Sequence, residues 1–492
     1  MFYTSTRDKS IRITSSEAIT KGISDEGGLF VPCEIPQLSS DDIRGMIPMS
    51  YKERAKKILA LYLTDFTPEE IDYCVEGAYA DGKFDSEKVA PLVHFKGDAN
   101  ILELFRGPTC AFKDMALQLL PYLLTTASKR AAPDKEIVIL VATSGDTGKA
   151  ALEGFKDVPG TKILVFYPIE GVSAMQKRQM QTQEGANVGV CAIKGNFDDA
   201  QTGVKKIFTD KAVAEKLAVS GMMFSSANSI NWGRLVPQVV YYCSAYCDMV
   251  DQGRVSLGDQ INVVVPTGNF GNILAAYYAK QMGVPIKTLI CASNSNNVLT
   301  DFLTTGTYDR NRDFYTTTSP SMDILISSNL ERLLFHLSVN DDAEIRGYMD
   351  SLSKTGKYTV SDDIFEAVQN DFKAGFATEE EDAAAIKDAF ENGYLSDTHT
   401  AVALSVYGKL ADGTPTVIAS TASPYKFPKA VLAALLGSAP DIDEFDMTDK
   451  LADYTGTKIP APLSGLRDRA VRFDTVSEID GMEAQVYSML GI

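Results

Sequence analysis

The spacing of apolar residues predicts helices in the first hundred residues of the chain. Between residues 51 and 62, and again between 68 and 78, apolar side chains recur every three to four positions, the period of an amphipathic helix. A short strand-like stretch at 10–14 and the apolar triplet 29–31 precede these helices. We therefore expect residues 1–95 to form an N-terminal unit that is mostly helical.

Beyond residue 100 the pattern changes to strands that alternate with helices. The run 137–142 is wholly apolar and rich in β-branched residues, which is typical of a strand buried on both faces. Further strands are predicted at 162–167, 187–193, 261–265, 286–292 and 416–419, with helices at 149–156 and 173–184, after 272 and from 428. This alternation favours parallel sheets covered by helices.

The predicted fold is accordingly α/β, with two domains that each contain a parallel sheet, in addition to the helical N-terminal unit. The main body spans 96–435, and its segment 295–395 is helical and polar, as expected for an insertion or cap. Residues 436–492 form a C-terminal extension. We find no internal repeat and no low-complexity linker.

Three loops follow predicted strands at the positions where open α/β sheets bind ligands, namely 143–148, 266–272 and 420–424. In the second loop, Gly268 and Gly271 would let backbone N–H groups approach an anion at a helix start. A tight turn without a ligand is the alternative. Neither of the first two loops matches GxxxxGK[ST] or GxGxxG, which disfavours a nucleotide triphosphate or a dinucleotide.

A fourth segment, 103–114, ends on a lysine that is a candidate for covalent chemistry. Gly107-Pro108 fixes a turn, and Lys113 follows an aromatic residue at the start of an apolar helix predicted over 115–124. A lysine held among apolar side chains has a lowered pKa, which suits Schiff-base formation. Taken alone, however, this segment favours a surface lysine, which is what a lysine in such a position usually is.

Composition narrows the class of protein. Among 492 residues, 45% are hydrophobic and 23% charged, as in ordinary globular proteins, and no apolar stretch reaches the roughly 20 residues of a membrane helix. The opening segment lacks the apolar core of a secretory signal, so a cytoplasmic enzyme is expected. The net charge of −18 argues against nucleic-acid binding, and the acidic run 379–382 is expected to be a solvated face.

The cysteines and histidines indicate no metal site and no disulfide framework. The seven cysteines are scattered without a CxxC pair, and the chain has only three histidines. Cys243 and Cys247 lie four positions apart, but no histidine in the sequence is near enough to complete a ligand set. Free structural thiols and the absence of a metal are therefore expected.

Taken together, the segments resemble the threonine synthase family, pyridoxal-phosphate (PLP) enzymes of the tryptophan-synthase-β type. Further similarity lies at 14–32 and 397–401, so that the resemblance spans nearly the whole chain. The motifs that carry it occur in the family's order: GPTCAFKDMALQ at 107–118, TSGDTGKAA at 143–151, NSINWGR at 228–234 and PTGNFGN at 266–272.

The resemblance implies a PLP site in the cleft between the two α/β domains. Lys113 would hold the cofactor as a Schiff base and then move protons at the α and β carbons. Thr421, with Ser420 as second choice, would hydrogen-bond the pyridine nitrogen, and Asp146 would lie near the ring hydroxyl. The residues implied to bind the cofactor phosphate are Gly268, Asn269, Phe270, Gly271 and Asn272.

A second phosphate, carried by the substrate, would be bound by Asn228, Ser229 and Arg234, with Ser144 and Thr147 as additional ligands. We expect 228 and 229 to begin a helix, with the arginine within two turns of it, because helix N–H groups and a guanidinium both suit a dianion. A surface ion pair is the alternative for the arginine.

The implied reaction converts O-phospho-L-homoserine and water to L-threonine and phosphate, the last step of threonine biosynthesis, by a carbon–oxygen lyase acting on a phosphate ester. Alternatives are a related PLP-dependent lyase or phospholyase of the same fold, and a non-catalytic protein with or without PLP. The expected partner is the small-molecule substrate, with no nucleic acid and no membrane, and the expected assembly is a monomer or homodimer.

Two positions depart from the family pattern. Ser423 stands where the family often has the histidine of a His-Pro-Ala-Lys-Phe segment, and Thr398 stands where a proline commonly precedes the equivalent of His399. If the first histidine assists catalysis elsewhere, Ser423 cannot do so here. His399 is a candidate for catalysis, with a hydrogen-bonded structural histidine as the alternative.

Overall fold

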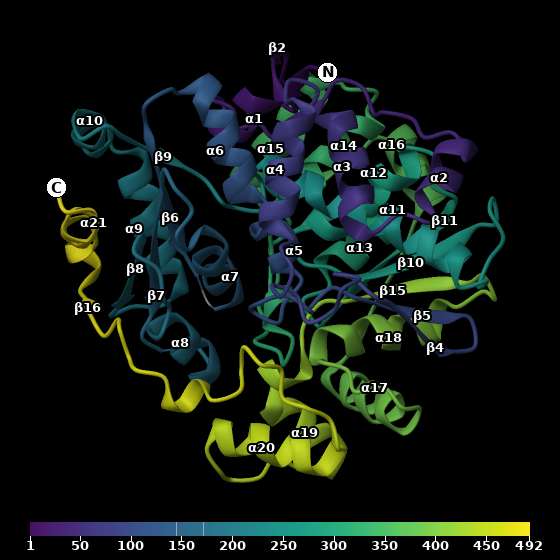
Figure 1. Ribbon diagram of the computed structural model, residues 1–492. Coiled ribbons are helices and arrows are strands. Elements are labelled where there is room, and N and C mark those ends of the chain that lie inside the picture. Colours follow the sequence, from purple (N-terminus) through teal and green to yellow (C-terminus); the bar gives the residue numbers. More distant parts are fainter. Residues whose placement is uncertain (144, 171) are drawn as a thin grey trace.

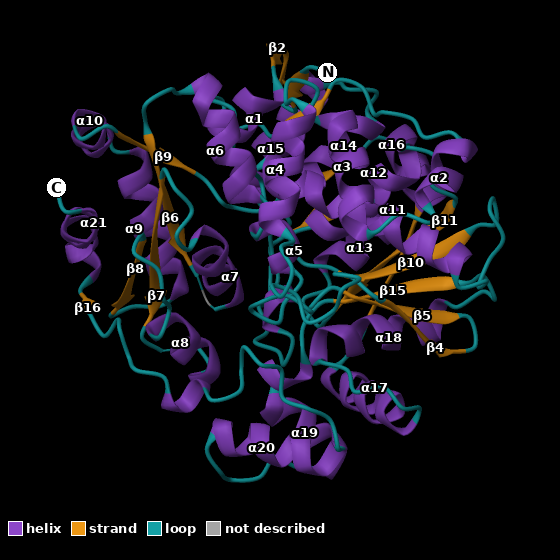
Figure 2. Cartoon of the chain, in the orientation of Figure 1, coloured by secondary structure: helices purple, strands orange, loops and turns teal. Residues whose placement is uncertain are grey.

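Two separate β-sheets organise the chain, one in each lobe of the molecule (Figures 1 and 2). The computed structural model describes residues 1–143, 145–170 and 172–492. The larger sheet has the order β14-β11-β10-β15-β5-β4, parallel except for the antiparallel edge strand β4. Its strands are β4 (Leu92–Lys96), β5 (Ala99–Glu103), β10 (Ile261–Pro266), β11 (Ile286–Ser293), β14 (Phe372–Phe376) and β15 (Thr416–Ser420).

The smaller sheet is wholly parallel and has the order β16-β8-β7-β6-β9. Its strands are β6 (Glu136–Ala142), β7 (Thr161–Pro168), β8 (Val188–Ile193), β9 (Met222–Ser225) and β16 (Val476–Ser477). The helices of this lobe are α7 (Asp146–Phe155), α8 (Ala174–Gln181), α9 (Phe197–Thr209) and α10 (Lys211–Val219). Two lobes with parallel sheets confirm the predicted fold class.

The N-terminal unit combines a small sheet with four helices. Strands β1 (Tyr3–Ser5), β2 (Asp8–Ile13) and β3 (Phe30–Pro32) pair antiparallel, and the helices are α1 (Ser15–Lys21), α2 (Ser40–Met46), α3 (Tyr51–Tyr62) and α4 (Pro68–Ala78). Helices α3 and α4 have the predicted bounds. Each begins at a capping box, Ser50 with Glu53 and Thr67 with Glu70, which fixes the first turn through local hydrogen bonds.

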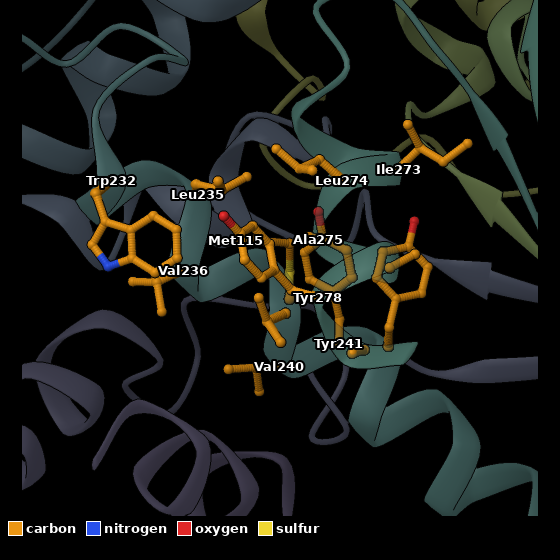
Figure 3. Close-up of a cluster of buried hydrophobic side chains, with 14 of the residues drawn as sticks. Met115, Trp232, Leu235, Val236, Val240, Tyr241, Ile273, Leu274, Ala275 and Tyr278 are labelled. Atoms are coloured by element: carbon orange, nitrogen blue, oxygen red, sulfur yellow. The ribbon is translucent and has the colours of Figure 1, made fainter. Parts of the chain in front are cut away.

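The core of the larger lobe lies around helix α11 (Trp232–Asp251), which is almost entirely buried. Figure 3 shows Trp232 and Tyr241 from this helix packed near Tyr278 of α12 (Gly271–Gln281) and Met115 of α5 (Lys113–Leu117). The Trp232 and Tyr278 rings meet edge to face at 5.5 Å. This packing holds the starts of α5, α11 and α12 close together, and each of those starts contributes to the site described below.

Three expectations about local structure were wrong. The helix predicted over 115–124 is broken, because α5 ends at Leu117 and α6 (Leu120–Ala131) begins three residues later. The segment 295–395 is not helical throughout, since its strand β14 pairs parallel with β11 and extends the larger sheet. The acidic run is not wholly solvated either, because Asp382 is only 1% exposed.

The segment 295–395 otherwise consists of short elements joined by loops. They are α13 (Val298–Thr305), β12 (Thr307–Asp309), the 3-10 turn η1 (Pro320–Met322), α14 (Leu330–Leu337), α15 (Asp342–Thr355), β13 (Lys357–Thr359), α16 (Asp362–Asp371) and α17 (Glu379–Glu391). Helix α18 (Thr398–Leu410) then leads into β15, and the turn η2 (Pro424–Lys426) follows that strand.

The C-terminal part of the chain joins both lobes. Helices α19 (Pro428–Leu436) and α20 (Glu444–Thr455) lie beside the larger lobe, and the chain then runs through η3 (Leu466–Asp468) to β16, η4 (Ile479–Gly481) and α21 (Met482–Leu490) next to the smaller sheet (Figure 1). All seven cysteines are free, as expected. Over the described residues, no helix is long and apolar enough to cross a membrane, and no cluster of three or more metal-binding side chains occurs.

Candidate active site

A cavity of about 780 Å³ opens where strands of both sheets end. Its walls come from the loops that follow β6, β9, β10 and β15, which is the carboxyl-end position expected from the sequence. Ser144 was also expected here but falls outside the described residues. The other predicted site residues all line this cavity: Lys113, Asp146, Thr147, Asn228, Ser229, Arg234, Gly268, Asn269, Phe270, Gly271, Asn272 and Thr421.

Lys113 is the first residue of α5, and its amine faces the cavity. Its Nζ donates a hydrogen bond to Ser321 Oγ at 3.3 Å. Burial lowers the pKa of Lys113 to about 8, while the carboxylate of Asp146 opposes this shift and the charge of Arg234 adds to it. A substantial fraction of this lysine is therefore the free amine near neutral pH, which is the form that attacks a carbonyl carbon.

The loop between β10 and α12 has the features of an anion cradle. Phe270 adopts a left-handed conformation with φ of 63°, and no side chain caps the helix that starts after it. The Tyr242 hydroxyl donates to Asn272 Oδ1, whereas Asn272 Nδ2 is buried and has no hydrogen-bond partner among the described residues. Uncapped N–H groups and an unused amide donor together provide several donors for one anion.

Arg234 is a buried cation that has no acidic partner. Its side chain donates to the carbonyl of Ala227 at 2.9 Å, and no carboxylate of the described chain lies within ion-pair distance. Burial lowers its pKa to about 10. Arg234 is only 7% exposed and lines the cavity, so its guanidinium is suited to binding an anionic ligand there.

The residues before Arg234 are arranged differently from the prediction. Helix α11 begins at Trp232 and is capped by Asn231, so Asn228 and Ser229 lie in the loop that precedes the helix instead of at its start. Ser229 Oγ donates to Asn228 Oδ1 at 3.1 Å, and both residues remain at the cavity wall. The capping asparagine comes three residues later than the pattern suggested.

Asp146 lies at the start of α7 and forms a buried ion pair that the sequence did not reveal. Its Oδ1 accepts from Lys426 Nζ at 2.6 Å and from Gln176 Nε2 at 2.9 Å. Burial by itself would raise the pKa of Asp146, but the charges of Lys426 and Lys113 hold it well below its usual range. Lys426 belongs to the late Lys-Phe pair of the family motif, and this was its only signal in the sequence.

His399 is hydrogen-bonded through both ring nitrogens. Nδ1 bonds to Asp397 Oδ2 at 2.8 Å, and Nε2 accepts from the backbone N–H of Ser321 at 3.2 Å. These contacts fit a structural histidine at the cavity wall.

The choice between the two hydroxyls after β15 is guided by their contacts. Ser420 Oγ is hydrogen-bonded to Thr400 at 3.0 Å and to Tyr394 at 3.2 Å, whereas Thr421 faces the cavity. Thr421 thus has the better position to meet a ligand.

Sequence reasoning missed one wall of the cavity. Helix α9 contributes Phe197, Gln201, Lys205 and Phe208, and the turn η1 contributes Ser321. None of these segments carries a motif, and the contact depends on how the chain folds back over the ends of the strands.

Comparison with known proteins agrees with this geometry. A family model described as "Threonine synthase N terminus" matches residues 2–79, and one described as "Threonine synthase, C-terminal" matches 400–486. Human "Threonine synthase-like 1" is 44% identical over 433 residues, which is 85% of this chain. The chain spans only 58% of the length of that relative.

Two further relatives match over nearly their full length. Threonine synthase of Schizosaccharomyces pombe is 37% identical over 467 residues, covering 88% of this chain and 89% of the relative. The crystal structure of PLP-bound threonine synthase from Brucella melitensis superposes with a TM-score of 0.89 at 38% identity, covering 100% of this chain and 99% of the other. Agreement over the whole chain at this identity places the protein in the threonine synthase family, as its motifs had indicated.

Proposed function

We propose that the chain converts O-phospho-L-homoserine and water to L-threonine and phosphate with pyridoxal phosphate as cofactor. One observation carries this proposal. A single cavity contains the amine of Lys113, the start of α12 and the buried Arg234, which has no carboxylate partner within the part of the chain that the structure describes. Two separate anion sites around one amine suit a cofactor phosphate and a substrate phosphate together.

The residues of the α12 loop fit the cofactor phosphate. Gly268, Asn269, Phe270, Gly271 and Asn272 would surround it, and the unpartnered Nδ2 of Asn272 supplies a donor that the protein itself leaves unused. Thr421 would meet the pyridine nitrogen. Because a hydroxyl is neutral, it does not hold that nitrogen protonated, as a carboxylate would. When bound, pyridoxal phosphate withdraws electrons from the carbon atoms beside the substrate amine.

Lys113 would serve as the base and acid of the reaction. With a pKa of about 8, its amine can take a proton from the α carbon at neutral pH and deliver it again, since the free and protonated forms are both populated. Asp146 lies on the same cavity wall, and the negative charge of its carboxylate favours the protonated form of Lys113.

Arg234, Asn228 and Ser229 would hold the phosphate that leaves the γ carbon. The guanidinium stabilises the charge that develops on the departing oxygen, and the two neighbouring side chains add neutral donors. Thr147, at the start of α7, faces the same cavity and is proposed as a further ligand. Loss of phosphate and addition of water at the β carbon then give threonine, so the cavity must exclude water until that step.

The decisive experiment is a product assay on O-phospho-L-homoserine with the purified chain and added cofactor. Threonine and phosphate should form in equal amounts, and Lys113→Ala should form neither. The wild type should show a visible absorbance band from bound cofactor, and Lys113→Ala should lack it. A wild-type protein that takes up no pyridoxal phosphate would overturn the cofactor assignment.

A second candidate is a phospholyase that converts the same substrate and water to 2-oxobutanoate, ammonia and phosphate. It is considered because identity is 44% to human threonine synthase-like 1, whose name leaves the reaction open, against 37% to the S. pombe threonine synthase. The same assay separates the two reactions, because 2-oxobutanoate and ammonia without threonine would support the phospholyase. A cytoplasmic location and assembly as a monomer or homodimer stay predictions.

A further inference from the structure

Lys426 is a buried cation that lies close to the cavity but is not one of its lining residues. It lies in the turn η2, after the last strand of the larger sheet, and its side chain is fully buried. Its Nζ contacts Asp146 Oδ1 at 2.6 Å and donates to the carbonyl of Thr109 at 3.0 Å. Asp146 belongs to the first turn of α7 in the smaller lobe, so this ion pair joins the two lobes directly behind the wall of the cavity.

The carboxylate of Asp146 has two lysines near it, one on each side of the wall. Lys426 approaches from the protein interior, and Lys113 lies in the cavity. Among the described residues, only Lys426 is in ion-pair contact with the carboxylate, and Gln176 donates to the same oxygen at 2.9 Å. The single negative charge of Asp146 therefore lies near two cations, and it forms its ion pair with Lys426.

From this arrangement we propose that Lys426 is a positioning residue, which acts through Asp146 to keep Lys113 available as a free amine. With the interior lysine in place, the carboxylate is already paired. Without it, Asp146 would be left buried beside a single cation, and its charge would hold Lys113 in the protonated form. The proposal assigns a role in the proposed reaction and therefore rests on the proposed function.

The charges around Lys113 act on its pKa in opposite directions. Burial lowers its pKa most, Asp146 raises it, and Arg234 and Lys426 lower it. Asp114 also raises the pKa of Lys113, and its carboxylate accepts from the backbone N–H and hydroxyl of Thr109 at 2.8 and 2.6 Å.

The charge of Lys426 also lowers the pKa values of three other buried groups, those of Asp114, Cys110 and Lys149. Removing the Lys426 charge would remove a repulsion from Lys113 and strengthen the pull of Asp146. Both changes raise the pKa of Lys113.

The test measures the pKa of Lys113 directly in the full chain, after the cofactor has been removed with hydroxylamine and dialysis. The initial rate at which acetic anhydride labels Lys113 is followed by peptide mass spectrometry from pH 6 to 11. In Lys426→Met, which keeps the volume but loses the charge, the midpoint should rise by about one pH unit, or about tenfold less free amine at pH 7. Lys426→Arg, which keeps the charge, should titrate near the wild type.

Two further variants distinguish a change in the pKa of Lys113 from simple misfolding. Lys426→Gln keeps hydrogen-bonding capacity without charge and should show the same upward shift. In Lys426→Met with Asp146→Asn, the upward shift should disappear, because the carboxylate that holds the ammonium is gone. A midpoint that stays unchanged or falls in both neutral single variants, Lys426→Met and Lys426→Gln, would overturn the proposal, even if their melting temperatures drop.

The labelling experiment needs neither cofactor nor substrate, so it can fail independently of the proposed reaction. A parallel measurement of pyridoxal-phosphate uptake at pH 7 relates the labelling result to the proposed reaction. If the wild type takes up the cofactor, Lys426→Met should do so about tenfold more slowly, in proportion to its smaller fraction of free amine. Equal rates of uptake in the two proteins would count against the proposal.

Discussion

Replacing Arg234 by methionine should separate the two proposed phosphate sites of the cavity. The guanidinium is 7% exposed, has one protein contact at 2.9 Å to the Ala227 carbonyl, and has no acidic partner among the described residues. A buried charge-assisted contact to a phosphate contributes about 2–4 kcal/mol, so kcat/KM for O-phospho-L-homoserine should fall roughly 30- to 700-fold.

The stability of the same variant should move in the opposite direction. Burial displaces the pKa of Arg234 from 12.5 to about 10, which corresponds to a cost of up to about 3 kcal/mol for keeping the cation in the folded protein. Methionine removes that cost and loses one hydrogen bond of about 1 kcal/mol. The free energy of unfolding of the cofactor-free chain should therefore be unchanged or slightly higher.

The assay combines steady-state kinetics, inhibition by inorganic phosphate, visible absorbance and thermal melting. Arg54 supplies a matched control, because it is equally buried but is paired with Asp248 at 2.6 Å, well away from the cavity residues. Arg54→Met should lower stability by about 3–5 kcal/mol, because it leaves Asp248 unpaired, and should leave KM unchanged.

Two results would refute the reasoning about Arg234. Loss of cofactor absorbance in Arg234→Met would show that the arginine holds the cofactor phosphate instead of the substrate phosphate. A large drop in melting temperature with unchanged KM would show that its role is structural.

Three further predictions concern single buried groups. Asp382 is buried without hydrogen-bond partners in the described structure, and its pKa is raised to about 8, so the cost of keeping its charged form in the folded protein grows as pH rises from about 4 to 8. Between pH 4.5 and 8.5, the free energy of unfolding of Asp382→Asn in denaturant titrations should therefore rise by about 2–4 kcal/mol relative to that of the wild type. Parallel pH profiles of the two proteins would contradict this. His399→Ala should lower the free energy of unfolding by about 2–3 kcal/mol, because Asp397 and the Ser321 N–H each lose a hydrogen-bond partner. The kcat of this variant should change less than about tenfold. A drop in kcat of about a thousandfold with unchanged stability would instead make the histidine catalytic. In the cofactor-free wild type, the rate at which acetic anhydride labels Lys113 should rise with a midpoint near pH 8, because the fraction of free amine increases as pH passes through the pKa. A midpoint near 10.5 would refute the buried environment of this lysine.

The elements that the sequence predicted correctly are those with local causes. Helices α3 and α4 were placed to the residue, because capping boxes at Ser50 and Thr67 fix their first turns within four residues of chain. Strand β6 was found because burial on both faces requires an unbroken apolar run, which residues 137–142 supply.

Strands β9 and β14 were missed, because one has only four residues and the other contains Lys373 and Gly375. Their strand conformation comes from pairing with β6 and β11, segments far away in the sequence.

The sequence by itself determined the family and the ordered set of loops, and it predicted the reactive lysine, because each motif is a short stretch whose residue types carry the chemistry. Only the tertiary structure decided the electrostatics of the site. The pKa of Lys113 and the pairing of Asp146 with Lys426 depend on burial and on groups far away in the sequence, and the pKa of Arg234 depends on burial. A charge–charge interaction depends on distance through space and on local dielectric, and neither quantity is encoded in a local stretch of residues.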